Sequence, residues 1–101
     1  MRMLLSMTFP NEPFNPLVKT KQLGPLIRKI LDDLKPETAY FTEQDGARGL
    51  LLVVDVAEPS RVPVIAEPFF LNFNADCRFR IAMTPADLEK AGLDSLGSRW
   101  S

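Results

Sequence analysis

The feature that most constrains the fold is an unbroken apolar run in the middle of the chain. Residues 49–54 read GLLLVV, and Asp55 follows at once. A strand with one face in water alternates polar and apolar residues, whereas an unbroken apolar run is typical of a strand covered on both faces. The sequence therefore predicts a strand over 49–56 that something covers on each side.

Alternating polar and apolar side chains predict three further strands, over 3–9, 37–43 and 75–83. Asp45 and Gly46 are residue types that accept the positive φ angles of a tight hairpin turn. The strands over 37–43 and 49–56 are therefore expected to form a hairpin.

Two main helices are expected, over 23–34 and 58–66. In the first, apolar residues recur at spacings of three and four, with charged residues opposite, until Pro36 stops the helix. In the second, Ser60 is a candidate N-cap and Pro68 marks the end.

Prolines and glycines mark the expected breaks. We expect a loop over 10–16, because it begins and ends with proline, and an aromatic turn over 69–73 that leads into the last strand. The apolar stripe of the first helix is in register only from Leu23 onward, so the pair Gly24-Pro25 should separate or sharply kink the segment 16–22.

After the last strand the sequence predicts one small helix. Thr84 is a candidate N-cap, Pro85 suits the first helical position, Asp87 is an acid in the first turn, and Gly92 closes the helix. Residues 94–101 are expected to be a loose tail, so the domain should span 1–93.

The expected order is strand, helix, strand, strand, helix, strand and a small helix, which is the split βαβ, or ferredoxin-like, α+β topology with a four-stranded antiparallel sheet. Two helices cover only one face of such a sheet, yet the strand over 49–56 is apolar on both faces. A second copy of the chain is the simplest cover, which predicts a homodimer.

Composition limits the chemistry and the partners. The chain has no histidine and one cysteine, so imidazole catalysis, the usual zinc sites and an internal disulfide are not expected. With a net charge of −1 and no long apolar segment, we expect no nucleic-acid partner, no membrane partner and no cofactor, and a cytoplasmic protein. RNA-recognition modules share this topology, but the central strands here, MLLSMTF and LLLVVDV, have no residue on the exposed side on which a base could stack.

The apolar strand ending in VVDV, the break at Pro68-Phe69-Phe70 after a short helix, and the strand 77–83 together resemble the dimeric α+β barrel superfamily. Within it, the chain looks most like the muconolactone-isomerase-like proteins, over about residues 1–83. The resemblance implies two sheets packed face to face and a small organic substrate held between sheet and helices. The superfamily includes isomerases, monooxygenases, decarboxylases and proteins with no known activity, so the resemblance leaves the function open among these.

The last strand carries the most distinctive polar pattern, ADCRFRIAM. Arg78 and Arg80 lie two residues apart, so their side chains share a face about 6.6 Å apart, together with Asp76. One interpretation is that the charges protect an edge strand from unwanted pairing. The other is that both arginines bind an acidic ligand where Asp55 and Asp76 leave one of them unpaired.

Three further residues are candidates for moving protons. Glu67 lies at the end of an apolar helix, where desolvation raises a carboxyl pKa. Asp55 interrupts the apolar strand and could orient a ligand, and Tyr40 could supply a hydroxyl group. The structural alternatives are a solvated Glu67, an Asp55 that ends its strand, and a Tyr40 that packs with its hydroxyl in water.

The aromatic residues Phe69, Phe70 and Phe73 could form one wall of a ligand site, or could simply fill the core. Cys77 alternates with the arginines and should point toward the helices, where a thiol behaves as a small apolar group.

Two functions of different classes follow. The favoured one is a homodimeric barrel that binds a small acidic organic ligand or a partner without catalysis, because no candidate residues form a nucleophile, base and orienting group. The alternative is an isomerase, lyase or cofactor-free monooxygenase resembling muconolactone isomerase.

Overall fold

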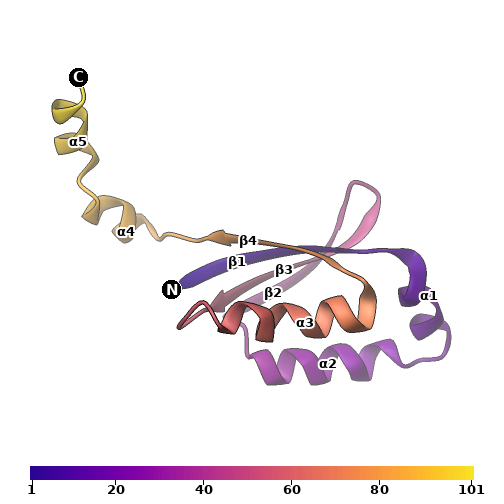
Figure 1. Ribbon diagram of the computed structural model, residues 1–101. Coiled ribbons are helices and arrows are strands. Elements are labelled where there is room, and N and C mark those ends of the chain that lie inside the picture. Colours follow the sequence, from indigo (N-terminus) through magenta and orange to yellow (C-terminus); the bar gives the residue numbers. More distant parts are fainter.

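The computed structural model describes residues 1–101 and contains one four-stranded antiparallel sheet. Its strands are β1 (Arg2–Phe9), β2 (Thr38–Gln44), β3 (Ala47–Asp55) and β4 (Asp76–Ile81). The spatial order is β2-β3-β1-β4, so β3 and β1 are central and β2 and β4 form the edges. Helices connect β1 to β2 and β3 to β4 (Figure 1), which confirms the predicted α+β topology of the ferredoxin-like kind.

Three helices lie on one side of this sheet: α1 (Asn11–Lys19), α2 (Leu23–Leu34) and α3 (Arg61–Phe73) (Figure 1). The core lies between the helices and the sheet, because one set of alternating side chains in β1 and β3 is buried there. Its buried strand residues are Leu5, Met7, Phe9, Leu50, Leu52 and Val54. We call this the helix face of the sheet and the other side the open face.

Phe9 lies at the centre of an aromatic cluster in this core. Its ring centroid is 5.2 Å from that of Phe14 and 5.3 Å from that of Phe73, and Phe69 lies 6.5 Å away. One ring from β1 thereby ties α1 and α3 to the sheet.

Two local predictions are confirmed in detail. Asp45 and Gly46 take φ angles of 54° and 80° in the turn between β2 and β3. At the start of α4 (Pro85–Lys90), the Asp87 N–H donates to Thr84 Oγ1 at 3.1 Å and the Thr84 N–H donates to Asp87 Oδ2 at 3.0 Å. Each residue satisfies a backbone donor of the other, which makes a complete capping box.

The prediction of a loop over 10–16 is wrong, because α1 occupies most of this segment. Glu12 has extended backbone angles, so regular helical geometry begins only at Pro13. Pro16 is the fourth residue of this regular helix, so its missing N–H removes only the first possible helical hydrogen bond, the one to the carbonyl of Glu12.

The segment 16–22 is separated from α2 as predicted, but the break does not lie at Gly24-Pro25. α1 ends at Lys19, Lys21 has a φ of 61°, and α2 begins at Leu23. Pro25 is the third residue of α2, a first-turn position at which a backbone N–H would have no helical acceptor.

The second main helix is also longer than predicted. α3 continues through Pro68 to Phe73, so neither the break at Pro68-Phe69-Phe70 nor the aromatic turn exists. Pro68 removes the hydrogen bond to the carbonyl of Val64, which is an exposed residue that water can reach. Burial of Phe69 and Phe73 against the sheet holds the helix together across this defect.

The expected loose tail is helical as well, because α5 spans Leu93–Arg99. Together with α4 it extends away from the body of the molecule (Figure 1). Of the helices, α3 is the longest at 13 residues, and no helix in the chain is both long and apolar enough to cross a membrane.

Candidate functional site

The open face of the sheet carries the arginines singled out in the sequence. Every second side chain of β1 and β3 is buried toward the helices, so the side chains between them point to the open face. The residues of β2 and β4 that pair with these point to the open face as well. Two cross-strand rows run over this face: Thr38, Val53, Leu4 and Arg80 form one, and Tyr40, Leu51, Ser6 and Arg78 form the next. No helix of the chain covers these rows (Figure 1).

The two arginines have different surroundings. Nη2 of Arg78 lies 3.2 Å from Oδ2 of Asp76, in an ion pair whose side chains are 65% and 56% exposed. Arg80 takes part in none of the ion pairs of the chain. Asp76 thus neutralises one guanidinium and leaves the other free for an external anion.

A recess of about 160 Å³ lies beside Arg78. The tip of the β2–β3 hairpin rises on the open side of the sheet (Figure 1), and the Oε1 of Gln44 accepts a hydrogen bond from Ser6 Oγ at 3.4 Å. The recess is lined by Ser6, Met7, Thr8, Gln44, Asp45, Ala47, Asp76 and Arg78. A guanidinium, two carboxylates, hydroxyl groups and an amide therefore meet in a space suited only to a small ligand, and Arg80 lies outside this lining.

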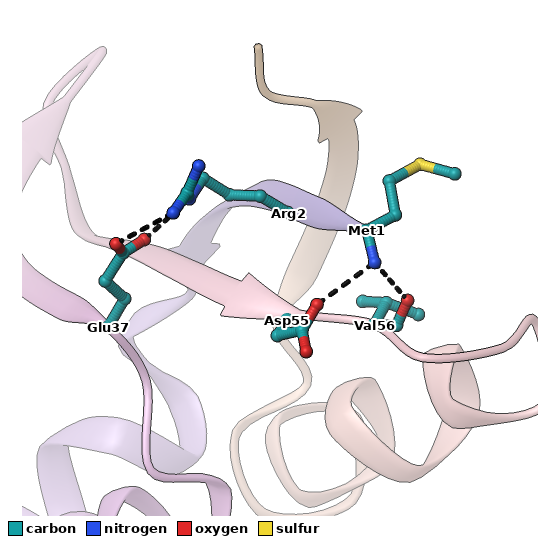
Figure 2. A network of polar contacts seen from close by, with 5 residues as sticks. All are labelled: Met1, Arg2, Glu37, Asp55 and Val56. Atoms are coloured by element: carbon teal, nitrogen blue, oxygen red, sulfur yellow. Dashed lines mark hydrogen bonds and ion pairs between the residues drawn. The ribbon is translucent and has the colours of Figure 1, made fainter. Parts of the chain in front are cut away.

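Asp55 is paired with the N-terminus (Figure 2), and neither Arg78 nor Arg80 forms an ion pair with it. Its Oδ1 accepts a hydrogen bond at 3.0 Å from the N-terminal ammonium group of Met1, which also donates to the carbonyl of Val56 at 2.9 Å. Next to it, Arg2 binds both carboxylate oxygens of Glu37, at 2.9 and 3.2 Å. The hydrogen bonds that Arg2 donates to Glu37, followed by the charge of the Glu37 carboxylate, raise the pKa of Arg2.

The three candidate proton-transfer residues are not brought together. Tyr40 lies on the open face of edge strand β2 and is 66% exposed, and Asp55 lies at the end of β3 in the contacts just described. Glu67 is an exposed residue of α3, on the opposite side of the sheet from Tyr40, and lines a groove with residues of α2. The chain holds no cluster of acids and cysteine that could ligate a metal ion.

The candidate aromatic wall is divided between the core and the surface. Phe69 and Phe73 are fully buried on the helix face, while Phe70 is 40% exposed on the outer side of α3. The sheet therefore separates these residues from Arg78 and Arg80.

Cys77 points toward the helices, as its alternation with the arginines predicts, and packs against the core. Burial, and secondarily the charge of Asp76, raises the pKa of its thiol to about 11. At neutral pH it is a protonated, apolar side chain rather than a nucleophile.

Sequence reasoning missed the contribution of Ser6, Thr8 and Gln44 to the recess. The alternation of β1 gives the side to which Ser6 and Thr8 point, and the Asp45-Gly46 turn gives the position of Gln44.

Comparisons with known proteins yield no family. No family model matches the chain, and no curated protein matches it. Among solved structures, the de novo designed protein Ferredog-Diesel is similar with a TM-score of 0.48 and 13% sequence identity, over 80% of this chain and 85% of that chain.

Proposed function

We propose that this protein is a cytoplasmic homodimer in which the open faces of two sheets meet and hold a small acidic organic ligand at Arg78 and Arg80, without catalysing a reaction. The packing of two sheets face to face is what the sequence resemblance to dimeric α+β barrels implies, whereas the ligand site proposed here lies on the open face and not between sheet and helices. The observation that carries the proposal is the free guanidinium of Arg80 on an otherwise uncovered sheet face.

Apolar side chains on the open face support the contact between two copies. Leu4, Leu51 and Val53 are neighbours across β1 and β3, and Tyr40 of β2 lies directly opposite Leu51. An apolar patch at the centre of a sheet, with charged residues at its edge, is typical of a protein interface. Closing two such faces removes these side chains from water, which favours association.

The same closure supports anion binding. When a partner covers β4, the guanidinium of Arg80 loses part of its hydration, and a desolvated charge is tolerated only beside an opposite charge. Within the chain Asp76 is paired with Arg78 and Asp55 with the N-terminus. A ligand carboxylate supplies the missing charge, and the planar guanidinium matches it with two parallel hydrogen bonds.

The size and chemistry of the recess favour a small ligand. Its volume of about 160 Å³ is below the roughly 300 Å³ at which pockets for drug-sized molecules begin. The hydroxyl groups of Ser6 and Thr8 and the amide of Gln44 provide hydrogen bonds for the remaining polar atoms of a short acid.

The separation of Tyr40, Asp55 and Glu67 favours binding over catalysis. General acid–base chemistry needs its groups within hydrogen-bond reach of one substrate. Glu67 lies behind the sheet from the recess, and Asp55 is occupied by the N-terminal ammonium group. The site therefore offers charge recognition without a matched acid and base.

Calorimetric titration with small dicarboxylates tests the proposal. We expect Arg80→Ala to weaken binding by about tenfold to a hundredfold, the loss of a charged hydrogen bond, while light scattering still reports a dimer. Arg28→Ala is the matched control, because Arg28 is an exposed arginine of α2 on the helix side, and it should bind as the wild type does. If no dicarboxylate gives heat with the wild type, the arginines serve only to protect the β4 edge and the proposal is wrong.

A further inference from the structure

The C-terminal arm, residues 82–101 with helices α4 and α5, stands apart from the rest of the molecule (Figure 1). It gives the chain a radius of gyration of 17.1 Å and a longest dimension of 59 Å. A compact chain of this length has a radius of gyration of only about 13 Å. The arm is therefore not packed as part of a single compact domain.

The domain does not need the arm for its own core. Every buried apolar residue lies between Leu5 and Ala75. The arm's own large apolar side chains face solvent instead: Leu88, Leu93, Leu96 and Trp100 are 46%, 54%, 38% and 75% exposed. Leucines and a tryptophan at this density are unusual for a segment that contacts only water.

Helix length gives a second, independent reason to expect a contact. α4 has six residues and α5 has seven, whereas isolated helices shorter than about 12–15 residues are marginal in water. The capping box of Thr84 and Asp87 supports only the first turn of α4. Packing against another surface is what stabilises helices this short.

The chain exposes more surface to solvent than a compact monomer does, and the excess is large enough for an interface with another molecule. The chain exposes 7211 Å², whereas a compact monomer of 11.4 kDa exposes about 5,800 Å². The excess, roughly 1,400 Å², is greater than the roughly 800 Å² that each partner buries in a standard protein interface.

Position and charge indicate which molecule it is. The arm leaves the end of β4 and rises on the open side of the sheet, away from α2 and α3 (Figure 1). A second copy seated on the open face would therefore lie beside it. The arm's carboxylates, Asp87, Glu89 and Asp94, take part in no ion pair, and Arg80 on the open face has none either.

We propose that the arm of each chain clasps the second copy, with Leu93, Leu96 and Trp100 packed against the partner's surface. This inference rests on the proposed dimer and adds an exchanged segment to it. The contact buries Trp100, gives α4 and α5 the surface they lack, and encloses the open face at the end opposite the β2–β3 hairpin.

Trp100 reports on this contact directly, because it is the only tryptophan of the chain. We would measure acrylamide quenching of its fluorescence in the full-length protein from nanomolar to micromolar concentration, with light scattering on the same samples. We expect Trp100 to be protected in the dimer and freely quenched after dilution to the monomer. Leu93→Ser/Leu96→Ser should expose Trp100 and weaken dimerisation roughly tenfold or more, because two buried leucines are lost.

Leu71→Ser is the matched control, since Leu71 is 78% exposed on the outer side of α3, and it should leave both readouts unchanged. A dimer in which Trp100 is freely quenched at every concentration overturns the arm contact but leaves the proposed dimer standing. A monomer at every concentration overturns both. Protection of Trp100 in samples that light scattering shows to be monomeric means that the arm folds back onto its own apolar recess of Met3, Val56 and Val62, which also overturns the exchange.

Discussion

Replacement of Phe73 tests whether the aromatic residues of α3 form a core or a ligand wall. Phe73 is fully buried, and its ring centroid lies 5.3 Å from Phe9, 5.8 Å from Phe14 and 6.4 Å from Phe69. Removing a fully buried phenylalanine costs about 3–5 kcal/mol, because the lost transfer free energy adds to that of the cavity. A domain of this size has a free energy of unfolding of roughly 5–15 kcal/mol. Phe73→Ala should therefore remove a large part of the stability.

Phe70→Ala is the matched control, from the same helix and the same residue type. Phe70 is 40% exposed, so its removal should cost only about 1–2 kcal/mol. The assay is urea unfolding followed by far-ultraviolet circular dichroism, at one fixed protein concentration because the proposed dimerisation would add to the apparent stability. Trp100 is unsuitable as a probe here, since it lies outside the core.

Phe73→Leu keeps the assay informative if Phe73→Ala does not fold, because it retains most of the side-chain volume. We expect its free energy of unfolding to lie between those of the wild type and Phe73→Ala. A Phe73→Ala variant that is no less stable than Phe70→Ala would contradict the core assignment. Loss of dicarboxylate binding in a stable Phe73→Leu dimer would instead place the ring at the ligand.

Three smaller predictions follow from single residues. Because burial raises the pKa of the Cys77 thiol to about 11 from the ordinary 9.0, it should react with a disulfide reagent at pH 8 about a hundredfold more slowly than a free thiol, and unfolding in urea should abolish the difference. Gly46→Ala should lower the free energy of unfolding by about 1–2 kcal/mol, because φ at this position is 80°, whereas Gly97→Ala at a helical position of α5 should not lower it. The backbone N–H of Thr84, and secondarily its hydroxyl group, lower the pKa of Asp87. The cap of α4 should therefore be fully formed above the pKa of an unfolded aspartate, about 4, and should be lost as the pH falls through the lowered pKa. The amide proton chemical shift of Thr84 should follow this titration, and a chemical shift that stays constant down to pH 2 would contradict the prediction.

The strands and their turn could be predicted because their signals are local. Alternation in β1 and β4 gives the side to which each residue points, and Asp45-Gly46 has few alternatives to a tight turn. The capping box at Thr84 and Asp87 is a signal of the same kind, since both residues lie within one turn.

The helix boundaries were harder because they depend on context rather than on residue type. Pro16 and Pro68 both indicate a break, yet one lies in a first turn and the other in a helix whose Phe69 and Phe73 are buried against the sheet. Tertiary packing offsets the lost hydrogen bond of Pro68, and no local pattern reports on that packing. The helical tail at α5 was missed for a related reason, because its exposed leucines stabilise a helix only against a surface outside the chain.

The candidate site could be predicted in part. The shared face of Arg78, Arg80 and Asp76 follows from strand period alone. The ion pair of Asp55 with the N-terminus, 54 residues away, could not be read from the sequence, because it depends on the pairing of β1 with β3. The closure of the recess by Gln44 depends likewise on how strongly the hairpin bends over the open face.

The central claim is that a second copy covers the open face, and light scattering at micromolar concentration tests it most directly. We predict a mass of twice 11.4 kDa for the wild type. Leu51→Lys, in the middle of the open face, should shift the protein to the monomer because it places a charge in the apolar contact, whereas Leu71→Lys on the outer side of α3 should not. A wild-type mass of 11.4 kDa throughout the micromolar range, or a dimer that Leu51→Lys leaves intact, would contradict the account.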